Sequence, residues 1–222
     1  MNGIQTRLQT IAVGDHFYTI ETLMDCNQFH DPDGSSAASG FGDTNWSLFG
    51  QIWPSSRMLA LVANTFDIKG KRILEIGAGL GLASLVLQNR GADITVSDAN
   101  PMAKQFFTAN LKRNSLAPLD FVSGDWTDTV NVLGLFDVII GSDVLYERQH
   151  ADEVSAFIAL HTFEKCEVII TEPNRGNRAS FCSKMNRYGF SGTHLHANHH
   201  FVDGLHYEGR VLNFSRNDLR VK

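Results

Sequence analysis

Short apolar runs alternate with segments of helical periodicity along most of the chain. The apolar runs predict five strands, at residues 72–76, 94–97, 119–122, 136–142 and 166–171. Apolar residues at helical spacing predict helices at residues 80–89, 100–114, 147–163 and 178–188. Strands that alternate with helices are typical of a mostly parallel sheet that is covered by helices on both faces.

The two ends of the chain depart from this pattern. Residues 192–202 and 209–215 alternate in polarity and predict an antiparallel pair of strands. Residues 6–11 and 17–22, joined around Gly14 and Asp15, predict a separate β-hairpin. The Gly-, Ser- and Asp-rich segment 30–46 is either an ordinary mobile loop or a lid over an active site.

The predicted fold is therefore α/β. We expect a doubly wound, mostly parallel seven-stranded sheet with an antiparallel last strand and an N-terminal β-hairpin extension. Residues 1–50 form the hairpin and loop in this interpretation, and residues 51–222 form the main domain.

Composition narrows the class of protein. The chain has 222 residues, 43% hydrophobic and 19% charged, which is typical of one globular domain with an embellishment. Because there is neither a run of about 20 apolar residues nor a targeting signal, we expect a cytoplasmic protein without a membrane role. A net charge of −5 argues against nucleic acid as a partner and favours a basic protein segment.

Cysteine and histidine do not predict a metal site. The three cysteines share no close spacing, so neither a disulfide framework nor a zinc site is indicated. Five histidines gather between His194 and His206, and two of them share a strand face. Because a strand pair that borders an active site uses histidine readily without metal, we expect no metal there.

The stretch ILEIGAGLGLASL, residues 73–85, contains the most informative turn. A strand runs through three glycines directly into a helix, which lets the backbone approach a ligand closely. A dinucleotide fingerprint needs a sixth-position glycine, but Leu82 stands there, so a nicotinamide-dependent dehydrogenase is disfavoured. The carboxylate of Glu75 and the acidic balance of the chain favour a cationic ligand without phosphates.

Polar side chains also end the next three predicted strands. Asp98 is placed to accept the hydroxyls of a ribose, or to cap the helix that follows. Asp125 and Trp126 are suited to the edge and face of an adenine, although Trp126 is equally suited to core packing. With Asp143 after the fourth strand, these groups share the carboxyl edge of one sheet, where open α/β folds bind ligands.

Four segments together resemble a known family: IWPSSRMLA at 52–60, LEIGAGLGL at 74–82, SGDW at 123–126 and FDVIIGSDVLYE at 136–147. The chain resembles class I, seven-β-strand S-adenosylmethionine-dependent methyltransferases, and more narrowly the protein-lysine methyltransferase-like group called methyltransferase family 16. The resemblance implies S-adenosylmethionine as cofactor. It also implies a set of cofactor-binding residues: Glu75, Gly77 and Gly79 for the methionine portion, Asp98 for the ribose, Asp125 and Trp126 for the adenine, and Trp53 and Ser142 beside the cofactor.

By the same resemblance, Asp143 and Tyr146 line the site of the target amine as catalytic residues. A carboxylate and a phenol oxygen near the attacking nitrogen stabilise the charge that develops there, but no residue is identified as the general base. Capping of the next helix by Asp143 and core packing of Tyr146 remain alternatives. Glu172, Asn174, Arg175 and Arg178 follow the fifth strand near the same edge, as substrate contacts or as capping residues.

The predicted function is therefore methyl transfer to a lysine side chain of another protein, by a monomeric enzyme. A small-amine N-methyltransferase and a non-catalytic cofactor-binding protein remain the alternatives. No [DNS]-P-P-[YF] motif follows the fourth strand, which disfavours many methyltransferases that act on nucleic acids or glutamine.

Overall fold

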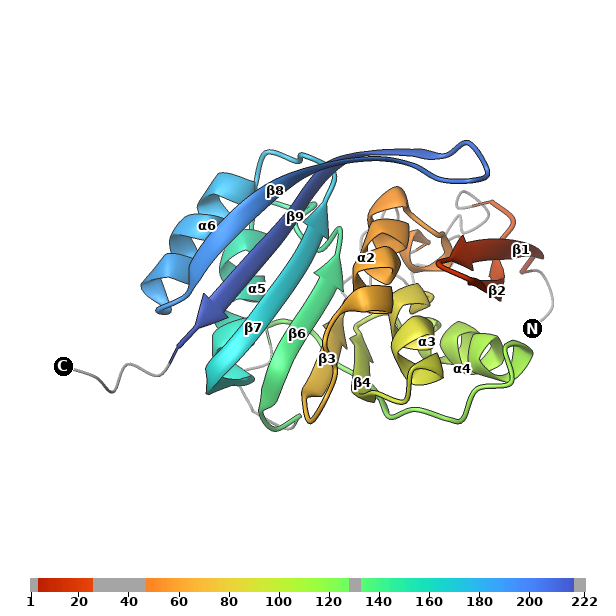
Figure 1. Ribbon diagram of the computed structural model, residues 1–222, viewed down its shortest axis with the longest axis horizontal. Coiled ribbons are helices and arrows are strands. Elements are labelled where there is room, and N and C mark those ends of the chain that lie inside the picture. The colour runs from red at the N-terminus through yellow and green to blue at the C-terminus, as the bar shows by residue number, and fades with distance from the viewer. Residues whose placement is uncertain (1–3, 26–46, 128–132, 218–222) are drawn as a thin grey trace, which may run out of the picture.

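The computed structural model describes residues 4–25, 47–127 and 133–217 of the chain. The segment 30–46, predicted to be a loop or a lid, lies outside the described residues. Figure 1 shows a twisted central sheet with helices on both faces and a two-stranded hairpin beside it. No helix of the described residues is long and apolar enough to cross a membrane.

The central sheet has seven strands in the order β5-β4-β3-β6-β7-β9-β8. Their bounds are Arg72–Ile76 (β3), Asp93–Asp98 (β4), Phe121–Ser123 (β5), Phe136–Ser142 (β6), Thr162–Glu172 (β7), Ser191–His200 (β8) and His206–Arg216 (β9). The strands from β3 to β7 pair in parallel, whereas β9 is antiparallel to both β7 and β8. The predicted seven-stranded sheet with an antiparallel last strand is confirmed.

Helices cover both faces of this sheet (Figure 1). The helices are Pro54–Thr65 (α2), Leu82–Asn89 (α3), Ala103–Arg113 (α4), His150–Leu160 (α5) and Arg178–Arg187 (α6). Successive residues of a strand point to opposite faces, so Val138 and Ile140 join the core under α2, α3 and α4, while Ile139 joins the core under α5 and α6. Both faces of β6 are buried, which explains its continuous apolar run.

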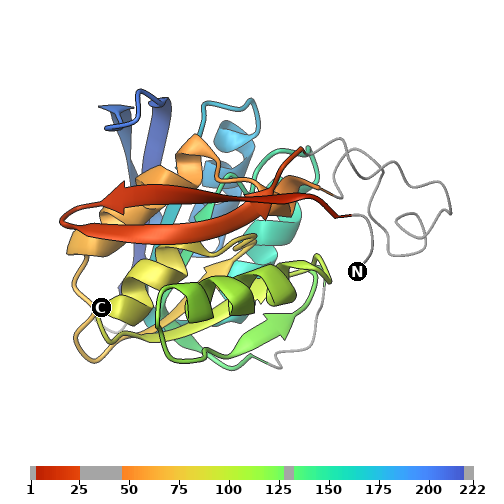
Figure 2. The same cartoon turned by 90° about the vertical axis from the view of Figure 1, so that its right-hand side faces the viewer.

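The N-terminal hairpin, Thr6–Val13 (β1) and His16–Leu23 (β2), turns at Gly14 and Asp15 as predicted. Figure 2 shows the hairpin running in front of α2 and above α4, and β1 contacts α2 while β2 contacts α4. The backbone N–H of Glu21 donates to Asn110 Oδ1 on α4 at 2.7 Å, and the Glu21 carboxylate pairs with Arg113 at 2.7 Å. The buried side chain of Ile20 packs into the same core, so the hairpin is joined firmly to the main domain.

Three of the predicted helices begin later in the structure than the sequence pattern predicted. The helix predicted from residue 80 begins at Leu82, because Gly81 has left-handed backbone with a φ of 70°. The helix predicted from residue 100 begins at Ala103, after Asn100 Oδ1 accepts a hydrogen bond from the Met102 N–H. The helix predicted from residue 147 begins at His150, and α2 was not predicted as a helix.

Candidate functional site

A cleft of about 810 Å³ opens at the carboxyl ends of β3, β4 and β6. The strand order reverses at this point, since β4 lies on one side of β3 and β6 on the other, and open α/β sheets bind ligands at such reversals. The volume suits a nucleoside-sized ligand. Nine of the ten predicted site residues line the cleft: Trp53, Gly77, Gly79, Asp98, Asp125, Trp126, Ser142, Asp143 and Tyr146.

The glycine turn between β3 and α3 forms one wall of the cleft. Gly77 has a φ of 56°, and a Cβ atom there would lie 2.9 Å from Val144 Cγ1 and 3.0 Å from Trp126 Cζ2. Glycine is therefore needed both for the backbone conformation and for the close packing of Val144 and Trp126 against the turn.

Glu75 is the predicted site residue that does not line the cleft. Its side chain is buried behind the glycine turn, where its carboxylate accepts hydrogen bonds from the N–H of Ser84, at 2.9 Å, and from the Ser84 hydroxyl. Burial raises the pKa of Glu75 to about 7, although both Ser84 hydrogen bonds oppose the shift. The carboxylate thus ties β3 to the first turn of α3.

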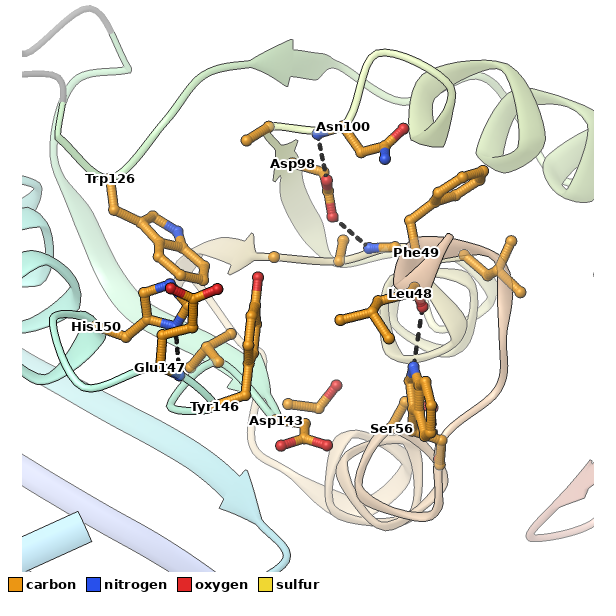
Figure 3. Close-up of a pocket in the computed structure, with 18 of the residues that line it drawn as sticks. Leu48, Phe49, Ser56, Asp98, Asn100, Trp126, Asp143, Tyr146, Glu147 and His150 are labelled. Atoms are coloured by element: carbon orange, nitrogen blue, oxygen red, sulfur yellow. Dashed lines mark hydrogen bonds between the residues drawn. The ribbon is translucent and has the colours of Figure 1, made fainter. Parts of the chain in front are cut away.

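Asp98 ends β4 and directs both carboxylate oxygens toward the turns around it (Figure 3). Oδ2 accepts from the Gly79 N–H at 2.7 Å, and Oδ1 accepts from the Asn100 N–H at 2.7 Å. Burial raises the pKa of Asp98, and these two hydrogen bonds oppose that rise. Because each carboxylate oxygen has a second lone pair, Asp98 can hold the turns and still accept ribose hydroxyls.

Three aromatic rings line the cleft opposite the Asp98 side. The His150 ring meets Trp126 edge-on at a centroid distance of 5.0 Å and meets Tyr146 edge-on at 4.4 Å. His150 Nδ1 accepts a hydrogen bond from the Glu147 N–H at 3.2 Å, and burial lowers the pKa of the imidazole. His150 therefore connects the ring predicted for adenine to the ring predicted for the target amine.

Tyr146 stands in the cleft with its hydroxyl directed toward the Asp98 side (Figure 3). Burial, followed by the negative charges of the surrounding carboxylates, raises the pKa of Tyr146 to about 12. The phenol is therefore protonated throughout the neutral pH range. It can donate its hydrogen to an acceptor or accept one from an amine, but it cannot act as an anionic base near pH 7.

Asp143 follows β6 in a left-handed conformation with a φ of 53°, and its N–H donates to the Thr171 carbonyl at 2.8 Å. Its carboxylate accepts a bidentate pair of hydrogen bonds from Arg175, at 2.7 Å from Nε and 3.0 Å from Nη2. The alternative in which Asp143 caps the next helix is wrong, because α5 begins at His150 with no side-chain cap at its N-cap residue.

Sequence reasoning missed several residues that line the cleft: Leu48, Phe49, Gln51, Ser56, Asn100, Glu147, Gln149, His150 and Glu153. Trp53 Nε1–H donates to the Leu48 carbonyl at 2.9 Å, which helps to hold Leu48 and Phe49 in the wall of the cleft (Figure 3). The apolar, aromatic-rich stretch WSLFGQIW before α2 was the available signal.

The charge of the cleft is strongly negative. In the part of the chain that the structure describes, five carboxylates line it, at Asp98, Asp125, Asp143, Glu147 and Glu153, against the single guanidinium of Arg175. Such a lining favours a cationic ligand and disfavours phosphates, in agreement with the sequence. Among the described residues, no group of three or more His, Cys, Asp or Glu side chains is arranged to hold a metal ion.

Comparison with known protein families gives a clear match. Residues 41–188, more than half of the chain, match the sequence profile of the family described as lysine methyltransferase. The chain belongs to the lysine methyltransferase family. S-adenosylmethionine is accordingly the cofactor of this family member, and the acidic, nucleoside-sized cleft with Asp98 and Trp126 fits that cationic nucleoside.

The chain is similar in sequence to two curated relatives, each over part of its length. The electron transfer flavoprotein beta subunit lysine methyltransferase of Mus musculus is 27% identical over 139 residues, covering 61% of this chain and 52% of the relative. The protein N-lysine methyltransferase METTL21A of Danio rerio is 32% identical over 103 residues, covering 43% of this chain and 47% of the relative. The chain thus spans about half the length of the curated relatives it matches.

Solved structures show the same fold. The T. thermophilus 16S rRNA N2 G1207 methyltransferase RsmC, solved with AdoMet and guanosine, superposes with a TM-score of 0.64 at 16% sequence identity. The superposition covers 96% of this family member and 51% of RsmC. At this identity the likeness concerns the fold alone.

Proposed function

We propose that the protein is an S-adenosylmethionine-dependent methyltransferase that methylates a lysine side chain of another protein. Family membership supports this function, and so does the single observation that an acidic, aromatic cleft carries Tyr146 within it and Asp143 at its rim. When bound, S-adenosylmethionine supplies a methyl group on a positively charged sulfur. The chain matches about half of each of these relatives.

In this proposal most of the predicted cofactor-binding residues contact the cofactor, and one supports the glycine turn. Asp98 accepts the ribose hydroxyls, Trp126 and Asp125 hold the adenine, and Gly77 and Gly79 let the backbone approach the methionine portion. Glu75 acts differently from the sequence prediction in this proposal: because it is buried and its Oε2 accepts both hydrogen bonds from Ser84, it positions the glycine turn from behind.

The target lysine must lose a proton before it reacts. With an unperturbed pKa of about 10.4, only about one lysine in 2,500 is neutral at pH 7. A bare Asp143 carboxylate would stabilise the ammonium form and oppose this loss, but its bidentate pair with Arg175 partly neutralises it. We therefore assign Asp143 and Tyr146 to orienting the amine and stabilising the positive charge that it gains as its bond to the methyl carbon forms and the bond between that carbon and sulfur breaks. The proton that the amine loses beforehand passes to water.

The test is transfer of a labelled methyl group from S-adenosylmethionine to proteins of a cell extract, followed by mass spectrometry of each labelled band. Label on lysine that depends on the wild-type enzyme and falls at least tenfold with Tyr146→Phe is the expected result. Label that appears only in small metabolites would favour the small-amine alternative. Cofactor binding without any transfer would favour a non-catalytic protein.

The remaining expectations stay predictions. They are a monomeric state, a cytoplasmic location, no role for nucleic acid, and a division of the chain at residue 50. Leu48 and Phe49, from the N-terminal part of that division, line the cleft, so we propose that the first part completes the site.

A further inference from the structure

Three arginines gather at the carboxyl end of β7, directly beside the rim residue Asp143. Arg175 and Arg178 follow β7, and Arg210 lies on β9 opposite Glu172 in the strand register. The Asn174 side-chain oxygen accepts hydrogen bonds from Arg178 Nη1 at 3.1 Å and from Arg210 Nε at 3.2 Å. A single neutral acceptor thus holds two guanidiniums together, next to a third. We call Arg175, Arg178 and Arg210 the arginine cluster.

The carboxylates around the arginine cluster do not balance its charge. Glu172 is 1% exposed and pairs with Arg178 at 3.4 Å, and Asp143 is 12% exposed and pairs with Arg175 at 2.7 Å. Among the residues that the structure describes, two inward-facing carboxylates therefore pair with two of the three guanidiniums of the arginine cluster. The arginine side chains are the outer members of these pairs, at 44% exposure for Arg175 and 30% for Arg178.

The guanidiniums also keep hydrogen-bonding capacity toward the outside. A guanidinium has five N–H donors, and within the described part of the chain Arg175 uses Nε and Nη2 for Asp143, while Arg210 uses Nε for Asn174. The fork geometry of the remaining donors matches a carboxylate. The surface beside the target-amine site is thus cationic, whereas the cleft itself is anionic.

We propose that the arginine cluster binds an acidic side chain, Asp or Glu, that lies close in sequence to the target lysine. This inference rests on the proposed function and specifies its substrate: a lysine in an acidic segment. It replaces the expectation of a basic segment, which came from the net charge of the whole chain. The amine enters the anionic cleft at Asp143, and the neighbouring carboxylate lies beside Asp143 on the arginine cluster.

The test measures peptide binding separately from methyl transfer. Three peptides share one lysine and carry glutamate, glutamine or arginine at the two positions on either side. Their affinities are measured by fluorescence anisotropy at low salt, with S-adenosylhomocysteine present so that no transfer occurs. We expect the glutamate peptide to bind roughly three- to tenfold more tightly than the glutamine peptide, as for one or two partly exposed ion pairs. The preference should fall as salt is raised.

Variants test whether the arginine cluster causes the preference for the glutamate peptide. Arg210→Gln should reduce the glutamate preference at least twofold, and Arg178→Gln serves as a second variant should the first fail to fold. Arg187→Gln is the matched control, because Arg187 lies exposed at the opposite end of α6 and the charge change is the same. It should leave the preference unchanged.

Two results would overturn the proposal. One is equal affinity for all three peptides, including no binding to any of them, or tighter binding of the arginine peptide. The other is displacement of the glutamate peptide by an equal concentration of single-stranded RNA, which would assign the cluster to phosphates. Neither result bears on the proposed function, whose failure appears separately as an absence of label in the transfer assay.

Discussion

Glu75 provides a quantitative test of how the glycine turn is supported. The folded protein raises the pKa of this buried carboxyl from 4.5 to about 7. A shift of about 2.5 pKa units corresponds to about 3 kcal/mol of differential stabilisation, since one unit is 1.36 kcal/mol. Replacing Glu75 by glutamine keeps the size and an oxygen acceptor for the Ser84 N–H, but removes the titration.

The direction of the pH dependence follows from which state, folded or unfolded, holds the proton of Glu75. Between pH 4.5 and 7 the folded state keeps the proton of Glu75 while the unfolded state has lost it. The stabilisation from this group is therefore fully present below pH 4.5 and is lost as the pH rises toward 7. We expect the free energy of unfolding of the wild type, relative to Glu75→Gln, to fall by about 2 to 3 kcal/mol between pH 5 and pH 8.

Urea unfolding of both proteins at pH 5, 6, 7 and 8 measures this difference, because other titrating groups cancel in the comparison. Glu208→Gln controls for the loss of one negative charge, since Glu208 is exposed on β9; its profile should run parallel to the wild type. If the wild-type and Glu75→Gln profiles are parallel as well, Glu75 is not held as a buried, proton-binding support, and the reasoning fails.

Three further substitutions test the cleft. Tyr146→Phe should lower the methyl-transfer rate roughly 10- to 100-fold while calorimetry shows cofactor affinity within about twofold, and a loss of affinity alone would contradict the role of the hydroxyl. Gly77→Ala, which forces a Cβ atom to 2.9 Å from Val144 Cγ1, should destabilise the fold by about 1–2 kcal/mol in thermal unfolding and weaken cofactor binding; wild-type values for both would refute the packing argument. Because burial lowers the pKa of His150, its stabilising effect is present above pH 6.5 and lost below it, so urea unfolding of His150→Phe should show a smaller acid-side loss of stability than the wild type.

The parts of the fold that depend on local pattern were predicted well. The strand at 136–142 has the predicted bounds, because both faces of β6 are buried from Val138 to Gly141 and the residues there are apolar or small. The turn at Gly14 and Asp15 was also predicted, since two alternating strands flanked a glycine. Helix starts were less accurate, because they depend on turn geometry such as the left-handed Gly81 rather than on periodicity.

In the site, too, the features that follow from local pattern were predicted, and the contacts that depend on tertiary packing were not. Residues at strand ends were identified because parallel strands bring their carboxyl ends to one edge of a sheet, whatever the intervening sequence. The pair between Asp143 and Arg175 was not predicted, because it joins residues 32 positions apart through the alignment of β6 with β7. The contact of His150 with Trp126 was missed for a similar reason: the first turn of α5 reaches the end of β5 only in the packed structure.

Net charge was the least informative sequence property for the substrate. A net charge of −5 for the whole chain favoured a basic protein segment as substrate. Charges are screened over roughly 8 Å at physiological salt, however, so the charge distribution near the site matters more than the net charge. Within the described residues, five carboxylates and the guanidinium of Arg175 line the cleft, where a sulfonium and an amine must lie together, and Arg178 and Arg210 lie beyond that lining. With negative charge in the cleft and positive charge beside it, an enzyme attracts the reacting cations without attracting basic segments in general. In the substrate that we propose, the neighbours of the lysine, not the lysine itself, therefore determine which protein is methylated.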